Sequence, residues 1–192
     1  MNPEIKHNAR KQEMLLQLNA LIDKEGFENL TVRKMCHALD ISIGTFYHYF
    51  PEKGDIALIL FSEIDNYFET EVAEKFVDYE PDNLITFSIA YGAFVISRGV
   101  ENCRYINLAP LKNKGHSYLD EGRGIFRSLF GIFDRGCKKN QFVLSEDSLE
   151  MSRMFMVLLR GYSSDWAKRG GNYDLMEALR KFSQLFCKSI TE

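Results

Sequence analysis

Apolar residues recur every three or four positions along most of the chain, and this spacing places them on one face of an α-helix. The first helix predicted in this way runs from about His7 to Glu25 and carries Leu18 and Ile22 on its apolar stripe. Gly26 follows as a C-cap, because glycine takes the left-handed backbone conformation without strain. Residues 1–8 are expected to form a loose tail. The recurring periodicity predicts an all-α protein.

The stretch that begins at Thr31 predicts two short helices joined by a tight turn. Thr31 and Ser42 stand where the two helices begin, and a hydroxyl there can accept a hydrogen bond from a free backbone N–H group. Asp40 stands where the first helix ends, and a short polar residue can take the left-handed conformation there. Phe46 and Phe50, four residues apart, are expected to fix the second helix against the first. This pattern is typical of a helix-turn-helix, whose second helix lies in the major groove of DNA.

Pairs of short amphipathic helices also occur in proteins that never touch DNA, but two residues favour the DNA-binding alternative. Gly44 is a poor helix former at the exposed start of a helix, which indicates close approach of a partner. Lys53 follows Pro51 at the start of the next helix, where the helix dipole disfavours a cation unless an anionic phosphate lies nearby. The residues predicted to contact DNA are Thr31, Arg33, Lys34, Ser42, Ile43, Gly44, Thr45, Tyr47, His48, Tyr49 and Lys53.

These predicted contacts divide into base contacts, which carry sequence information, and phosphate contacts, which set the register. Residues 43–45 open the recognition helix and are expected to meet base edges. The hydroxyl and imidazole tips of residues 47–49 suit phosphates. Arg33 has three open interpretations, namely a bidentate contact to guanine, a phosphate contact or a solvated charge.

The same segment resembles a known family. Residues 42–50, Ser-Ile-Gly-Thr-Phe-Tyr-His-Tyr-Phe, followed by Lys53 and an apolar stretch, resemble the DNA-binding signature of the TetR (tetracycline-repressor-like) family, and so do residues 26–33. The match covers roughly the first third of the chain, and Asp40 departs from it because the family often has glycine there. The resemblance implies an N-terminal three-helix helix-turn-helix DNA-binding domain, residues 1–52. It also implies a C-terminal helical ligand-binding and dimerisation domain, residues 53–192.

Further helices are predicted in the second part, separated by prolines, glycines and capping residues. A helix from about Pro51 to Val77 is long enough to connect the two parts. The others are expected at about 84–97, 100–108, 118–139, 145–168 and from 174 onward. In the last of these, four apolar residues alternate at spacings of four and three: Leu175, Leu179, Phe182 and Phe186. Such a seam is typical of half a four-helix bundle completed by a second copy, although ordinary packing within one subunit gives the same pattern. The family resemblance favours the homodimer.

The second part is also rich in aromatic residues, and the resemblance implies a helical pocket there that binds a small molecule and tilts the connecting helix. The candidate lining residues are Phe87, Tyr91, Phe94, Tyr105, Phe126, Phe130, Met154, Tyr162 and Trp166. The side chains considered for orienting a polar group of the ligand are Arg98, Arg104, Asn107 and His116. Aromatic residues at helical spacing form plain core more often than they line a pocket.

Composition and charge limit the functional classes to which the protein can belong. The chain of 192 residues is 45% hydrophobic, enough for one or two small domains, and its net charge of −3 excludes a generic polyanion binder. Residues 1–55 hold seven Lys or Arg against eight Asp or Glu, so DNA binding must depend on clustering of the cations. The four cysteines form no C-x-x-C pair, so no metal site is expected, and no cofactor is expected either. No signal peptide is evident, so reduced thiols in the cytoplasm are expected. No apolar run approaches the roughly 20 residues of a membrane span.

The sequence therefore favours a ligand-responsive transcriptional regulator, most simply a repressor. It would bind a palindromic operator in double-stranded DNA as a homodimer, and an unidentified small molecule would release it. An activator or nucleoid-associated protein without an effector, and a helical protein-interaction module, remain as alternatives. An enzyme would need converging nucleophile, base and oxyanion groups, and the sequence offers no such catalytic arrangement.

Overall fold

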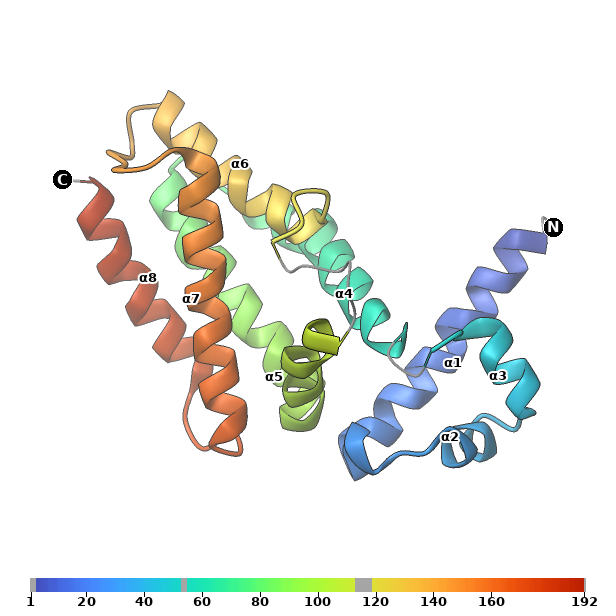
Figure 1. The fold of residues 1–192 in the computed structure, drawn as a ribbon. Helices are drawn as coiled ribbons and strands as arrows, with labels where there is room; N and C mark the ends of the chain where they lie inside the picture. The colour runs from blue at the N-terminus through green and yellow to red at the C-terminus, as the bar shows by residue number, and fades with distance from the viewer. Residues whose placement is uncertain (1–2, 53–54, 113–118, 192) are drawn as a thin grey trace.

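The computed structural model describes residues 3–52, 55–112 and 119–191, and the regular structure within these ranges is entirely helical. An N-terminal group of three helices lies apart from a C-terminal bundle, and α4 joins the two (Figure 1). The helices are α1 (Pro3–Glu25), α2 (Val32–Ala38), α3 (Ile43–Tyr49), α4 (Asp55–Tyr67), α5 (Glu80–Lys112), α6 (Gly124–Lys138), α7 (Ser148–Lys168) and α8 (Leu175–Thr191). The all-α prediction is confirmed.

The caps predicted for the helix-turn-helix are present. The hydroxyl of Thr31 accepts a hydrogen bond from the backbone N–H of Lys34 at 3.2 Å. Ser42 likewise accepts from the N–H of Thr45 at 3.0 Å. Asp40 adopts a left-handed backbone with φ 51°, as the sequence predicted for a short polar residue at this position. Thr31 and Asp40 thereby mark where α2 begins and ends, and Ser42 marks where α3 begins.

A first hydrophobic core holds α1, α2 and α3 together. Leu18, Ile22 and Met35 have no more than 1% of their surface exposed and surround the rings of α3. Phe46 and Phe50 are completely buried, and their ring centroids lie 5.2 Å apart. Full burial of such a side chain contributes roughly 1.5–3 kcal/mol. The two rings therefore fix the inner face of α3 and turn the rest of that helix outward.

A second core forms around α5, which packs against α6, α7 and α8. Aromatic side chains dominate it: the rings of Phe68 and Phe87 lie 4.5 Å apart, and those of Phe133 and Phe155 lie 5.9 Å apart. Within α5 the backbone leaves the helical conformation at Gly99, with φ 82°. The sequence predicted a break at this glycine, and the two halves of α5 follow different directions from it.

Helix α4 contributes to both cores. Ile56 in its first turn is 1% exposed and belongs to the first core, whereas Ile64 belongs to the second. A π-helical turn, Phe68–Val72, and a 3-10 turn, Ala73–Lys75, extend α4 along the bundle. Helix α5 also touches α1 of the N-terminal part. The two parts are therefore joined by shared packing as well as by the chain.

Three expectations from the sequence are wrong. Helix α1 begins at Pro3, so most of the predicted tail is helical; proline is compatible with the first turn of a helix. Helix α6 begins only at Gly124, because Arg123 before it has an extended backbone. Phe130 was expected to face inward but is 36% exposed, since it lies opposite the buried stripe that includes Leu129 and Phe133.

One helix among the described residues, α5 over Glu80–Arg104, has the length and apolar composition of a membrane span, which the sequence analysis did not anticipate. Half of its most apolar window is buried inside the protein. Its packing against α7 and α8 at the centre of the second core accounts for this apolar composition.

A buried charge secures the start of α5. Glu80 is 1% exposed, and Arg135 donates to both of its carboxylate oxygens at 2.8 and 3.0 Å. Lys139 and Asn83 donate to the same carboxylate at 3.1 and 2.9 Å. Burial opposes ionisation, but these hydrogen bonds outweigh it and hold the pKa of the Glu80 carboxyl below its ordinary value.

Glu80→Gln should therefore lower the free energy of unfolding by about 1.5–3 kcal/mol at neutral pH, because hydrogen bonds to a charged group are lost. The lowered pKa means that this stabilisation is present above the unfolded-state pKa, about 4.3, and is lost as the pH falls through the folded-state pKa. The gap between wild type and variant should then close in acid. Urea unfolding across pH measures this; Glu177→Gln, at an exposed ion pair on α8, is the control and should change stability little. Equal losses for the two variants would contradict the assignment.

Candidate nucleic-acid interface and interior cavity

The outer face of α3 is built from small and amphipathic side chains. Ile43 and Tyr47 are 45% and 47% exposed, although both have large apolar surfaces. Thr45 and His48 are exposed beside them. Because Phe46 and Phe50 fix the opposite face, these side chains project from the edge of the N-terminal unit, where α3 lies (Figure 1). A rigid helix with such a face fits the major groove of DNA.

Gly44 has no structural reason to be glycine. A Cβ atom added there would meet only the hydroxyl oxygen of Ser42, at 3.8 Å, which is ordinary contact. Glycine inside a helix costs roughly 0.5–1 kcal/mol relative to alanine. Nothing in the fold of the single chain requires glycine at this position. The absence of a side chain at Gly44 therefore supports close approach by another molecule.

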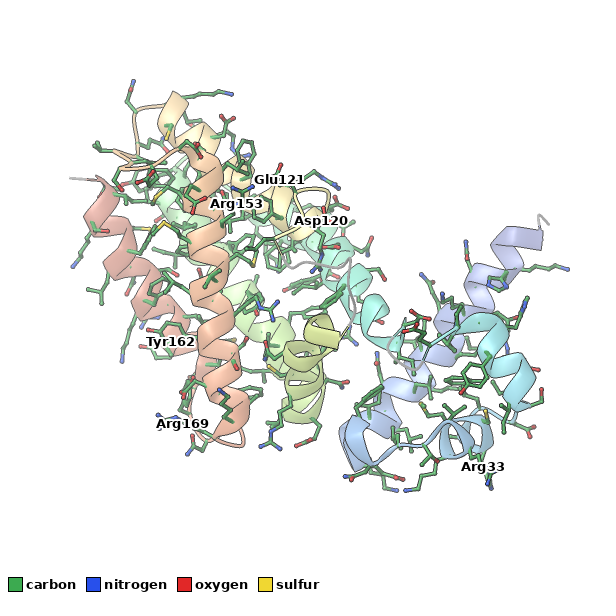
Figure 2. All side chains as sticks on the ribbon, in the orientation of Figure 1. Arg33, Asp120, Glu121, Arg153, Tyr162 and Arg169 are labelled. Atoms are coloured by element: carbon green, nitrogen blue, oxygen red, sulfur yellow. The ribbon has the colours of Figure 1, made fainter. Side chains whose placement is uncertain are left out.

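Arg33 of α2 lies at the outer edge of the N-terminal unit (Figure 2). It lines an open depression between α2 and α3 together with Ile43. His37 lines the same depression and is exposed, although the sequence analysis did not select it as a DNA contact. Its helical spacing of four residues from Arg33 was the signal that would have found it.

Three other predicted DNA contacts already have partners within the chain. The ammonium group of Lys34 lies 3.1 Å from a carboxylate oxygen of Glu25. Thr31 and Ser42 act as helix caps, and the Ser42 hydroxyl also lies 2.8 Å from that of Thr45. The pair of Lys34 with Glu25 is partly exposed, and exposed pairs are weak. A phosphate at Lys34 would therefore compete with Glu25 for the ammonium group.

Helix α1 supports the end of the recognition helix. The ring of His7 stacks on that of Tyr49 with centroids 4.5 Å apart, and it meets the ring of His48 edge-on at 5.2 Å. Lys11, one turn further along α1, lies 5.6 Å above the ring of Phe50. No role for His7 was predictable from the sequence, because only the fold brings it to α3. Lys53 lies outside the described residues, as do His116 and the side chain of Tyr105.

A cavity of about 50 Å³ lies in the second part of the chain, between α4, α5, α6 and α7. Its described lining residues are Phe61, Ile64, Tyr91, Phe94, Val95, Arg98, Cys103, Ile106, Asn107, Arg123, Ile125, Met156, Arg160 and Ser163. Burial raises the pKa of the Cys103 thiol to about 11, and the thiol donates to the carbonyl of Ser163 at 3.3 Å. Cys103 is thus a protonated wall residue and not a nucleophile.

Two of the aromatic candidates, Tyr91 and Phe94, line this cavity. Phe87 and Phe126 are buried core residues away from it, as is Trp166, whose indole N–H donates to the carbonyl of Tyr173 at 3.1 Å. The remaining candidates whose side chains are described, Phe130, Met154 and Tyr162, are exposed or half-buried and do not line the cavity. Of the polar candidates, Arg98 and Asn107 line it, whereas Arg104 donates to the carbonyl of Ala167 at 3.0 Å. Arg123 and Arg160 were missed because distant helices bring them to the cavity.

The last two helices present an apolar face that no described element covers. On α7 it consists of Met154, Val157 and Leu158, with Gly161 open beside them; on α8 its most exposed residue is Leu185, at 68%. Phe182 and Phe186 lie half-buried at its margin. Leu175 and Leu179, by contrast, are completely buried in the core of the single chain, so they cannot offer an exposed contact surface. The expectation that Leu175 and Leu179 form a contact surface for a second copy is therefore wrong.

Comparison with known proteins agrees with the helix-turn-helix geometry. Residues 18–59 match the model of "Bacterial regulatory proteins, tetR family". The HTH-type transcriptional regulator SAR2658 of Staphylococcus aureus (strain MRSA252) is 25% identical over 131 residues, covering 62% of this chain and 70% of that protein.

Solved structures resemble the whole fold. FadR from Bacillus subtilis, solved in complex with stearoyl-CoA, has a TM-score of 0.66 and 20% identity over 92% of this chain and 96% of its own. A TetR-family regulator from Pectobacterium atrosepticum has a TM-score of 0.71 and 14% identity over 100% of this chain and 99% of its own. The matched segment contains the capped α2–α3 pair described above, and the proteins matched regulate transcription and are not enzymes. Residues 18–59 therefore form a helix-turn-helix of the TetR-family type, and the chain as a whole has the fold of TetR-family transcriptional regulators.

Proposed function

We propose that this regulator is a ligand-responsive repressor that binds a palindromic operator as a homodimer in the cytoplasm and is released when a small molecule enters the cavity. The observation that carries the proposal is the position of α4. One end of this helix is packed under the DNA-binding unit through Ile56, and further along it Phe61 and Ile64 form a wall of the cavity. A ligand that moves this wall also moves the support of α3.

The size of the cavity supports a switch and not a permanently filled site. Its free volume of about 50 Å³ is far below the roughly 300–1,000 Å³ of pockets that hold drug-sized ligands. A ligand of that size can enter only by displacing lining side chains, among them those of α4. The related fold of FadR was solved with a ligand bound, which supports a ligand-binding role for this architecture.

The uncovered face of α7 and α8 supports the homodimer. A stripe of exposed apolar side chains along two helices is unfavourable in water, and two copies of the stripe can form a four-helix bundle. A two-fold dimer presents two copies of α3 in opposite orientations. Its DNA site is then an inverted repeat whose half-sites lie about one helical turn, roughly 34–36 Å, apart.

Selection of bound fragments from a random double-stranded DNA pool tests the function directly. The purified protein should enrich an inverted repeat with half-sites about one turn apart. Transcription of a reporter placed behind that sequence should fall when the protein is present. Enrichment of no sequence would favour a protein-interaction module, and a rise in reporter transcription would favour an activator.

Gly44→Ala should separate DNA binding from folding. The added methyl group has room in the free protein and improves helix propensity by up to about 1 kcal/mol, so the melting temperature should stay the same or rise. In the complex the methyl group would occupy the space into which a base edge fits. Affinity for the selected operator, measured by fluorescence anisotropy, should fall roughly tenfold or more. Unchanged affinity would place Gly44 away from the DNA.

Leu185→Glu should yield monomers that bind the operator weakly, because a charge at the centre of an apolar interface loses its hydration. Leu16→Glu is the matched control, since Leu16 is 62% exposed but lies on α1, far from α8. Analytical ultracentrifugation at micromolar concentration should give a dimer for the wild type and for the control. A monomeric wild type would contradict the proposed dimer.

A further inference from the structure

Three arginines line the cavity, and none of its described lining residues is acidic. Arg98 comes from α5, Arg123 from the residue before α6 and Arg160 from α7. The guanidinium of Arg98 lies 4.9 Å from the ring centroid of Phe94, and that of Arg123 lies 4.6 Å from that of Phe61. Stacking on aromatic rings holds these two cations at the wall of the cavity.

The carboxylate that neutralises Arg123 belongs to α4. Asp65 accepts from Nε and Nη2 of Arg123, both at 3.1 Å, and the two side chains are 13% and 21% exposed. Asp65 Oδ1 also accepts from the backbone N–H of Ile125 at 3.0 Å. Arg123, at the N-cap position of α6, makes no side-chain cap of its own, so Asp65 supplies the anion that this helix start prefers. The bond network thereby fastens α4 to the start of α6.

The carboxylate beside Arg98 also belongs to α4. Glu63 Oε2 lies 3.2 Å from Nη2 of Arg98, in a geometry that makes an ion pair but no hydrogen bond. No acceptor among the described residues reaches the buried Nε of Arg98. Burial raises the pKa of the Glu63 carboxyl above its ordinary value, and the nearby Arg98 offsets this only in part. The Glu63 carboxylate is therefore poorly stabilised where it stands.

The third arginine has a neutral partner: Nη2 of Arg160 donates to the amide oxygen of Asn107 at 2.9 Å. Among the described residues, three guanidinium groups line the cavity, and the carboxylates that pair with Arg98 and Arg123 both come from α4. A cation would be repelled there, and a neutral apolar molecule would leave both ion pairs intact. An anionic head group, by contrast, can pair with the guanidinium groups of the cavity.

We propose, on the basis of the ligand-responsive function proposed above, that the effector is an amphipathic carboxylate whose head replaces Asp65 on Arg123 and Glu63 on Arg98. A carboxylate matches the planar fork of a guanidinium and can also occupy the N-terminus of α6. The stacked arginines stay in place, and the two displaced carboxylates take α4 with them toward water. The charge of the ligand is thus converted into movement of the helix that supports α3.

The ligand class is tested by calorimetry on the full chain with octanoate, 1-octanol and octylamine, which share one alkyl chain and differ in the charge of the head group. Octanoate should bind roughly tenfold or more tightly than 1-octanol, as expected for hydrogen bonds to charged groups, and octylamine should not bind. Equal affinity for octanoate and 1-octanol, or tighter binding of octylamine, would overturn the proposal.

Displacement of α4 is tested by removing the competing carboxylates. Asp65→Asn should tighten octanoate binding several-fold, because the amide holds Arg123 less strongly, and Glu63→Gln should act in the same direction through Arg98. Glu69→Gln is the matched control: Glu69 also pairs with an arginine of α6, Arg127, but neither residue lines the cavity. If one of the two variants fails to melt cooperatively, the octanoate affinity of the other still tests the displacement. Octanoate affinities equal to that of Glu69→Gln would overturn the displacement.

These titrations need no DNA, so their failure is distinct from failure of the proposed function. A chain that binds its selected operator but ranks the three ligands differently refutes the amphipathic carboxylate alone. A chain that ranks the ligands as expected but selects no DNA refutes the repressor and leaves the assignment of the cavity supported.

Discussion

Helix α4 belongs to two hydrophobic cores at once, and the rest of the structure depends on this. Ile56 is buried with Met35 and Phe46 in the first core, while Ile64 is buried in the second. Close-packed cores do not deform gradually, since a gap of a fraction of an ångström already costs contact energy. In the proposed switch, a displacement of α4 at one end is transmitted to the other. The recognition helix is tied to the same core through Phe46, so it follows.

The carboxylates of α4 add a chemical control to this mechanical link. Asp65 holds the start of α6, and Glu63 lies against Arg98 of α5. The ion pairs of these two carboxylates connect α4 to the other walls of the cavity, and in the proposed switch an anion of suitable shape replaces both carboxylates. The exposed pair of Glu69, in the π-helical turn that follows α4, with Arg127 of α6 lies outside the cavity, so it would remain while the inner ion pairs exchange. Ion pairs of the same kind thus have different roles, which their burial decides.

The sequence predicted best those features that arise from residues close together in the chain. Thr31 and Ser42 cap their helices as expected, and Asp40 takes the left-handed conformation. Each depends on one side chain and the backbone within a few residues, so spacing alone reveals it. The start of α6 was misjudged, because the carboxylate that satisfies the N–H of Ile125 comes from Asp65 on another helix. A local sequence pattern cannot predict a cap whose residue is so far away in the chain.

The same reason explains the candidate sites. The outward face of α3 follows from the spacing of its phenylalanines, whereas the cavity gathers Arg98, Arg123 and Arg160 from three separate segments. Aromatic residues at helical spacing, such as Phe87, form the core. Their spacing in the sequence does not predict where the packed helices leave a cavity. Helix α8 is apolar on two sides, and only the packing of Leu179 against α5 distinguishes its inner from its outer side.

Coupling between the cavity and the DNA-binding face is the central claim, and thermodynamic reciprocity gives its most direct measurement. Octanoate affinity is determined by calorimetry for the free dimer and for the dimer saturated with its selected operator. Coupling through α4 predicts that operator DNA weakens octanoate binding by the same factor by which octanoate weakens operator binding, within the roughly 5–150-fold range typical of allosteric proteins. Equal octanoate affinities in the two titrations would contradict the account.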